Sequence, residues 1–89
     1  MERRHVVVHG SVQGVGFRYA VERAANSRGV GGWVKNRVDG TVEAVFEGER
    51  EDVDALVEFC RSGPRGAEVR SVDVVEETAD GLPGFRVTG

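Results

Sequence analysis

Residues 6–25 read VVVHGSVQGVGFRYAVERAA, in which a valine run, a glycine-containing loop and a helical repeat follow one another directly. The three β-branched residues Val6 to Val8 predict a strand over residues 4–10 with both of its faces covered. From Phe17 onward the apolar residues recur at i, i+3, i+4 and i+7, which predicts a helix over residues 17–28. A strand and a helix are therefore joined by a short loop.

The rest of the sequence alternates between strand and helix patterns. The dipeptide Asp39-Gly40 separates two runs rich in strand-forming residues and predicts a tight hairpin turn between them. In a later strand, Val72 and Val74 are the pair expected to face the core. The further predicted elements are strands at residues 32–38, 41–47, 69–76 and 85–87 and a helix at residues 50–62.

The element order β-α-β-β-α-β-β indicates an α+β fold. Two helices that cross over between strands and pack on one face form the ferredoxin-like split βαβ sandwich, βαββαβ. We expect a four-stranded antiparallel sheet with a short additional C-terminal strand. Right-handed crossovers place the first strand at the centre of the sheet. With 89 residues, the chain has room for a single domain, residues 1–89.

Composition excludes several classes of protein. Hydrophobic residues are 39% and charged residues 30%, which argues against disorder, and the net charge of −3 argues against a broad basic surface for nucleic acid. No apolar run approaches the ~18 residues that a membrane span requires, and the N-terminal run is too short for a secretory signal. The one cysteine, Cys60, fits a reducing cytosol. We expect a cytoplasmic protein with no membrane or nucleic-acid partner.

The loop Gln13-Gly14-Val15-Gly16-Phe17-Arg18 is the most informative segment for chemistry. Glycines allow the backbone to turn tightly and to direct several N–H groups into one concavity, where the helix N-terminus adds partial positive charge. The planar guanidinium of Arg18, in the first helical turn, can reach the same concavity. The pattern indicates a phosphate site, although a simple strand-to-helix turn needs the same glycines.

Asn36 is a second candidate, because asparagine is disfavoured in strands and a buried carboxamide needs a partner or a cavity. It is expected to share a face with Val34 and Val38. The alternative is that the Asn36 carboxamide forms its hydrogen bonds with the nearby turn.

The remaining reactive side chains predict no further site. His5 and His9 lie on one face of the first strand without a third ligand nearby, so we expect no metal. Cys60 lies on the apolar face of the second helix and is expected in the core.

Three motifs resemble the acylphosphatase family: Gly10-Ser-Val-Gln-Gly-Val-Gly-Phe-Arg18, Gly32-Trp-Val-Lys-Asn36 and Asp39-Gly40-Thr41-Val42. The resemblance extends over essentially the whole chain. It implies hydrolysis of the carboxyl–phosphate bond of acyl phosphates to a carboxylate and inorganic phosphate, without a metal or organic cofactor. It matches Arg18 to the family's phosphate-binding arginine and Asn36 to its water-orienting asparagine. The matching phosphate-binding backbone amides are those of Gln13, Gly14, Val15, Gly16, Phe17 and Arg18.

The sequence departs from the family at Arg37, where vertebrate members often carry threonine, and at the terminal Val87-Thr88-Gly89. The first departure bears on substrate handling near the cleft, and the second bears on stability. From the size of the chain we expect a monomer that acts on a small molecule, and a free-standing enzyme. The alternatives are an acylphosphatase-like domain that handles carbamoyl phosphate within a larger protein, and a non-catalytic ferredoxin-like binding module.

Overall fold

The computed structural model describes residues 1–89, and it contains every element that the sequence predicts. The elements in chain order are β1 (Glu2–Ser11), α1 (Phe17–Ser27), β2 (Gly31–Asn36), β3 (Val42–Gly48), α2 (Arg50–Ser62), β4 (Glu68–Glu77) and β5 (Phe85–Val87). The strands β1 and β4 are longer than expected at both ends. The predicted ferredoxin-like α+β fold is confirmed.

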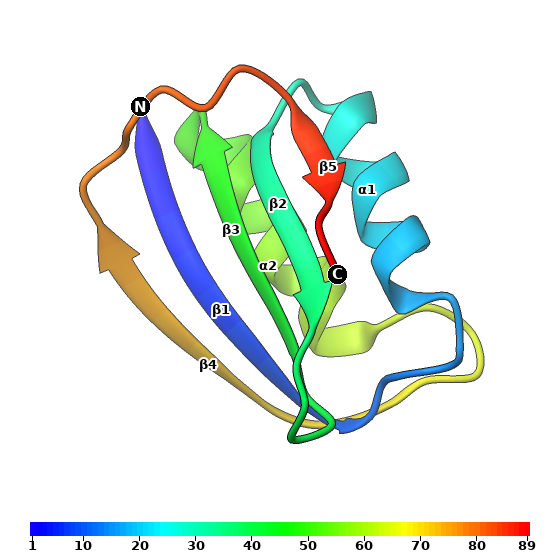
Figure 1. The fold of residues 1–89 in the computed structure, drawn as a ribbon. Helices are drawn as coiled ribbons and strands as arrows, with labels where there is room; N and C mark the ends of the chain where they lie inside the picture. The colour runs from blue at the N-terminus through cyan, green and yellow to red at the C-terminus, as the bar shows by residue number, and fades with distance from the viewer.

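The five strands form one sheet in the order β4-β1-β3-β2-β5. The first four strands pair antiparallel, whereas β5 runs parallel to β2. Both helices lie on one side of the sheet (Figure 1). β1 is an interior strand, as expected, but the middle position belongs to β3 because β5 extends the sheet beyond β2.

The core lies between the sheet and the two helices. Alternate residues of β1, Val6 and Val8, are fully buried there, and Phe17 from α1 and Leu56 from α2 pack against them. Cys60 is also fully buried, as predicted, and this burial raises the pKa of its thiol to about 12.

The prediction that both faces of β1 are covered is wrong. Val7 is only half-buried, because both helices pack on the opposite face and leave this side of the sheet open. On the open side, side chains of different strands contact one another: the His5 ring lies edge-on to the Trp33 ring, with the ring centroids 6.1 Å apart. A valine run thus marked an interior strand without marking two-sided burial.

Two local predictions also need correction. The β2–β3 connection is a five-residue turn, residues 37–41, because Asn36 pairs with Val42; Gly40 alone has a positive φ, of 91°. Val74 is 36% exposed, since it lies on the edge strand β4, while Val72 does pack against the core.

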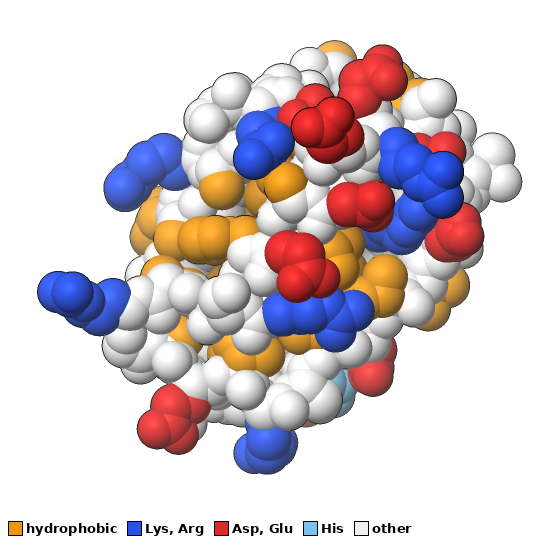
Figure 2. Space-filling model, turned by 180° about the vertical axis from the view of Figure 1, so that it is seen from behind, with side chains coloured by type: hydrophobic (Ala, Val, Ile, Leu, Met, Phe, Trp, Pro, Cys, Tyr) orange, Lys and Arg blue, Asp and Glu red, His pale blue; other side chains and the backbone are white.

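Seen from behind, the molecule carries acidic and basic side chains interspersed over the visible face (Figure 2). Hydrophobic side chains are visible between them. No helix of the structure combines the length and the apolar character needed to cross a membrane.

Candidate active site

The loop between β1 and α1 presents free backbone donors at a helix N-terminus. Gly14 and Gly16 have φ of 76° and 80°, in the left-handed region, and Gly16 is the N-cap of α1. None of the backbone N–H groups from Gln13 to Arg18 donates a hydrogen bond to another protein group. The first backbone hydrogen bond of α1 runs from Ala20 N to Gly16 O, at 3.1 Å. A Cβ built at Gly14 or Gly16 would meet no atom within 4 Å. Unpaired donors, open space and the helix dipole together suit an anion.

Arg18 is the second residue of α1 and is half-buried beside this loop. Its Nη1 donates to the backbone oxygen of Gly89, at 2.7 Å, and its guanidinium carbon lies 5.7 Å from the centroid of the Tyr19 ring. Because a guanidinium carries five N–H donors, the bond to Gly89 leaves others available for an anion.

Asn36 is the last residue of β2, and its backbone N–H donates to the same Gly89 oxygen, at 2.9 Å. The structure therefore brings Arg18 and Asn36 against one shared acceptor, although 18 positions separate them in the sequence. The side-chain Oδ1 of Asn36 is buried and has no hydrogen-bond partner in the protein. An acceptor in this state is suited to a water or ligand donor.

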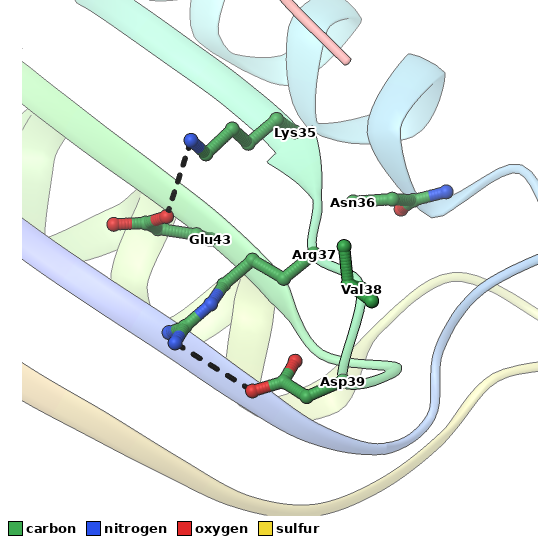
Figure 3. Close-up of a pocket in the computed structure, with 6 residues that line it drawn as sticks. All are labelled: Lys35, Asn36, Arg37, Val38, Asp39 and Glu43. Atoms are coloured by element: carbon green, nitrogen blue, oxygen red, sulfur yellow. Dashed lines mark ion pairs between the residues drawn. The ribbon is translucent and has the colours of Figure 1, made fainter.

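The side chain of Asn36 points away from those of Lys35, Arg37 and Glu43 and toward the start of α1 (Figure 3). It shares the core-facing side of β2 with Val34, which is fully buried, as predicted. The expectation that Val38 lies on the same face is wrong: the strand ends at Asn36, and Val38 is fully exposed in the turn.

The pocket shown in Figure 3 lies at this strand end and is lined by Lys35, Asn36, Arg37, Val38, Asp39 and Glu43. Its charged residues pair with one another, Lys35 Nζ with Glu43 at 3.8 Å and Arg37 with Asp39 at 3.5 Å. Arg37, the departure from the family pattern, is thus directed away from Asn36.

The two histidines are held by carboxylates on the open side of the sheet. His5 bonds to Glu43 at 2.6 Å and to Glu77 at 2.9 Å, and His9 bonds to Asp73 at 2.9 Å. Burial alone would lower the pKa of His5, but the hydrogen bonds to Glu77 and Glu43 outweigh it and raise that pKa. No group of three or more His, Cys, Asp or Glu side chains is arranged to hold a metal ion.

The side chain of Gln13 makes a contact that the sequence does not predict. The side-chain Nε2 of Gln13 donates to Arg37 O at 2.7 Å and to Thr41 O at 2.9 Å. Gln13 was predicted only as a backbone donor, because a contact across 24 to 28 positions leaves no local pattern.

Comparison with known proteins shows the family to which the chain belongs. A family model described as Acylphosphatase matches residues 4–87. An acylphosphatase from Thermococcus kodakarensis is 51% identical over 87 residues, covering 98% of this chain and 96% of its own. The crystal structure of acylphosphatase from Bacillus subtilis matches with a TM-score of 0.96 at 38% identity, covering 100% of both chains. The crystal structure of T. kodakarensis HypF matches with a TM-score of 0.84 at 34% identity, covering 100% of this chain and 12% of that one.

The free amides at the start of α1, the shared contact of Arg18 and Asn36, and relatives matching nearly end to end lead to one assignment. The chain belongs to the acylphosphatase family, and its activity is the hydrolysis of acyl phosphates to a carboxylate and inorganic phosphate.

Proposed function

We propose that Arg18 and the backbone N–H groups of the 13–18 loop bind the phosphoryl group, and that Asn36 orients the attacking water. The observation that supports this proposal is the shared contact with Gly89, whose oxygen accepts from both the Arg18 guanidinium and the backbone N–H of Asn36. Phosphoryl transfer depends mainly on positioning and on stabilisation of charge, which such groups supply.

The loop supplies fixed donors for the phosphoryl oxygens, and Arg18 adds a full positive charge. As charge shifts among these oxygens in the transition state, the hydrogen bonds from donors already in place become stronger, and the donors do not need to move. A net charge of −3 does not oppose this binding, because the loop and Arg18 act over a few ångströms.

The free Oδ1 of Asn36 accepts a hydrogen bond from the water and directs the water oxygen at phosphorus. As the new P–O bond forms, the bond from phosphorus to the acyl oxygen breaks, and the carboxylate leaves with the electron pair. A carboxylate needs no proton to depart, so the step requires no general acid. The water's proton passes to a nonbridging phosphate oxygen.

The decisive experiment compares Arg18→Ala with Arg23→Ala, in which an exposed arginine of the same helix is removed. Loss of acetyl phosphate or benzoyl phosphate is followed, and inorganic phosphate is used as a competitive inhibitor. We expect Arg18→Ala to lose nearly all turnover and phosphate affinity while circular dichroism shows a folded chain, and Arg23→Ala to retain both. Retained phosphate affinity in Arg18→Ala would contradict the proposal.

The similarity to a region of HypF supports one alternative, a domain that handles carbamoyl phosphate within a larger protein. The phosphoryl end of carbamoyl phosphate presents the same oxygens to Arg18 and the loop. A comparison of kcat/KM for carbamoyl, acetyl and benzoyl phosphate tests it: a preference for carbamoyl phosphate above tenfold favours the alternative.

We further infer a monomer in the cytoplasm. The buried free thiol of Cys60 fits a reducing compartment, and the core is closed within one chain. Light scattering coupled to size-exclusion chromatography tests the monomer, and fractionation of the source cells tests the compartment.

A further inference from the structure

We propose that the side chain of Gln13 is a positioning residue for hydrolysis: its carboxamide sets the place of the 13–18 loop relative to Asn36. The inference rests on the proposed function, in which the loop holds the phosphoryl group and Asn36 holds the water. It concerns the side chain of Gln13, as distinct from the backbone amide already assigned to the loop.

The carboxamide connects two segments that are otherwise separate. The bonds from Gln13 Nε2 to Arg37 O and Thr41 O are the only hydrogen bonds between residues 12–17 and the 37–41 turn. The carboxamide nitrogen carries two N–H donors, so each of them has one carbonyl acceptor. Gln13 immediately precedes Gly14, and Arg37 immediately follows Asn36, so the link joins the two halves of the site directly.

The turn that receives these bonds is well fixed internally. Arg37 N donates to Thr41 O at 2.9 Å, and Gly40 N donates to Arg37 O at 3.2 Å. Asp39 Oδ1 accepts from both the backbone N–H and the hydroxyl of Thr41, at 3.0 and 2.6 Å. The loop has no comparable internal hydrogen bonds. Val12, Val15 and Phe17 attach it to the core by packing, and the Gln13 side chain supplies its hydrogen bonds to the turn.

Gln13→Met keeps the approximate length of the side chain and removes both N–H donors without adding a charge. Free to shift, the loop would still bind phosphate through its own amides and Arg18, but the bound phosphorus would lie out of line with the water. We expect kcat to fall by about 10- to 100-fold, the effect of a misplacement near 1 Å, with KM and the phosphate inhibition constant within about threefold.

Glu47→Gln is the matched control, because Glu47 also accepts bonds from the backbone of a distant segment, but at the opposite end of β3. All variants are assayed where circular dichroism shows them folded. The control is expected to keep kcat despite a lower melting temperature, which separates loss of positioning from loss of stability.

A double-mutant cycle with Asn36→Ala provides the sharpest test. If Gln13 acts through the alignment of Asn36 with the phosphoryl group, Gln13→Met changes kcat by less than about threefold once Asn36 is absent. If the losses of kcat in the two single variants multiply in the double variant, the inference is overturned. It is also overturned if Gln13→Met keeps full kcat while Asn36→Ala is defective. Either result leaves the proposed function standing. Full kcat in Asn36→Ala overturns the proposed function itself.

Discussion

Replacement of Glu47 by glutamine tests how a buried carboxylate holds the C-terminal part of the fold. The Glu47 side chain is fully buried on β3. Its two oxygens accept bonds from the backbone N–H groups of Asp80, Gly81 and Leu82 at 2.8, 2.8 and 2.9 Å, and from Arg3 Nη1 at 2.7 Å. These bonds hold the segment that leads from β4 to β5.

The magnitude follows from the lowered pKa of this carboxyl. Burial alone would raise its pKa, but the bonds from Asp80, Arg3, Leu82 and Gly81 outweigh burial and lower the pKa from 4.5 to about 2. At about 1.4 kcal/mol per pKa unit, the folded state gains about 3 kcal/mol from the ionised form. Domains of this kind are stable by only about 5–15 kcal/mol in total, so the loss is large.

The sign of the pH dependence is fixed by the direction of the shift. A depressed folded-state pKa contributes stability that is fully present above the unfolded pKa, 4.5, and is lost as pH falls toward about 2. Glu47→Gln is neutral throughout this range. We therefore expect it to be about 3 kcal/mol less stable than the wild type at neutral pH, with more than half of that difference gone by about pH 3.

Urea denaturation followed by the fluorescence of Trp33, at neutral pH and at steps down to about pH 3, measures the difference. Glu68→Gln is the control, because Glu68 is exposed on β4 and makes no side-chain hydrogen bond or ion pair. A Glu47→Gln cost below about 1 kcal/mol at neutral pH, or a cost that does not shrink on acidification, would refute the reasoning.

Three further predictions concern the site. Asn36→Ala should lower kcat by about 10²–10³ with little change in inhibition by phosphate, as for loss of one transition-state group; an equal loss of phosphate affinity would contradict the division of roles. Gly14→Val should weaken phosphate inhibition, because φ of 76° strains any β-branched residue even though a Cβ meets no neighbour; unchanged inhibition and turnover would count against backbone binding there. Activity on acetyl phosphate should be unaffected by EDTA; loss on chelation, with recovery on adding a divalent ion, would rule out a metal-free reaction.

Periodic patterns predicted the elements well because each pattern reports which face of a segment is buried. The spacing at Phe17 and Val21 located α1, and that at Val53, Leu56 and Cys60 located α2, with all five side chains buried. The same logic failed for Val7 and Val74, where coverage depends on the placement of helices and on the position of a strand within the sheet. Neither the placement of the helices nor the position of a strand in the sheet can be read from a short segment of sequence.

Asp39-Gly40 illustrates a turn signal that is correct in place and wrong in type. The dipeptide lies in the turn, but Asp39 has a negative φ, because its carboxylate accepts bonds from Thr41 and closes a longer turn. The hydrogen bonds lower the pKa of Asp39. A local dipeptide therefore predicted the reversal without predicting the pairing of Asn36 with Val42.

The sequence alone determined the order of elements, the family resemblance and the candidate residues of the 13–18 loop and Asn36, because these are properties of contiguous segments. Only the tertiary structure decided that Arg18 and Asn36 meet at Gly89, that Gln13 joins the loop to the 37–41 turn, and that Glu47 holds residues 80–82. The physical reason is that each depends on hydrogen bonds between segments distant in sequence, whose geometry exists only after the sheet has formed.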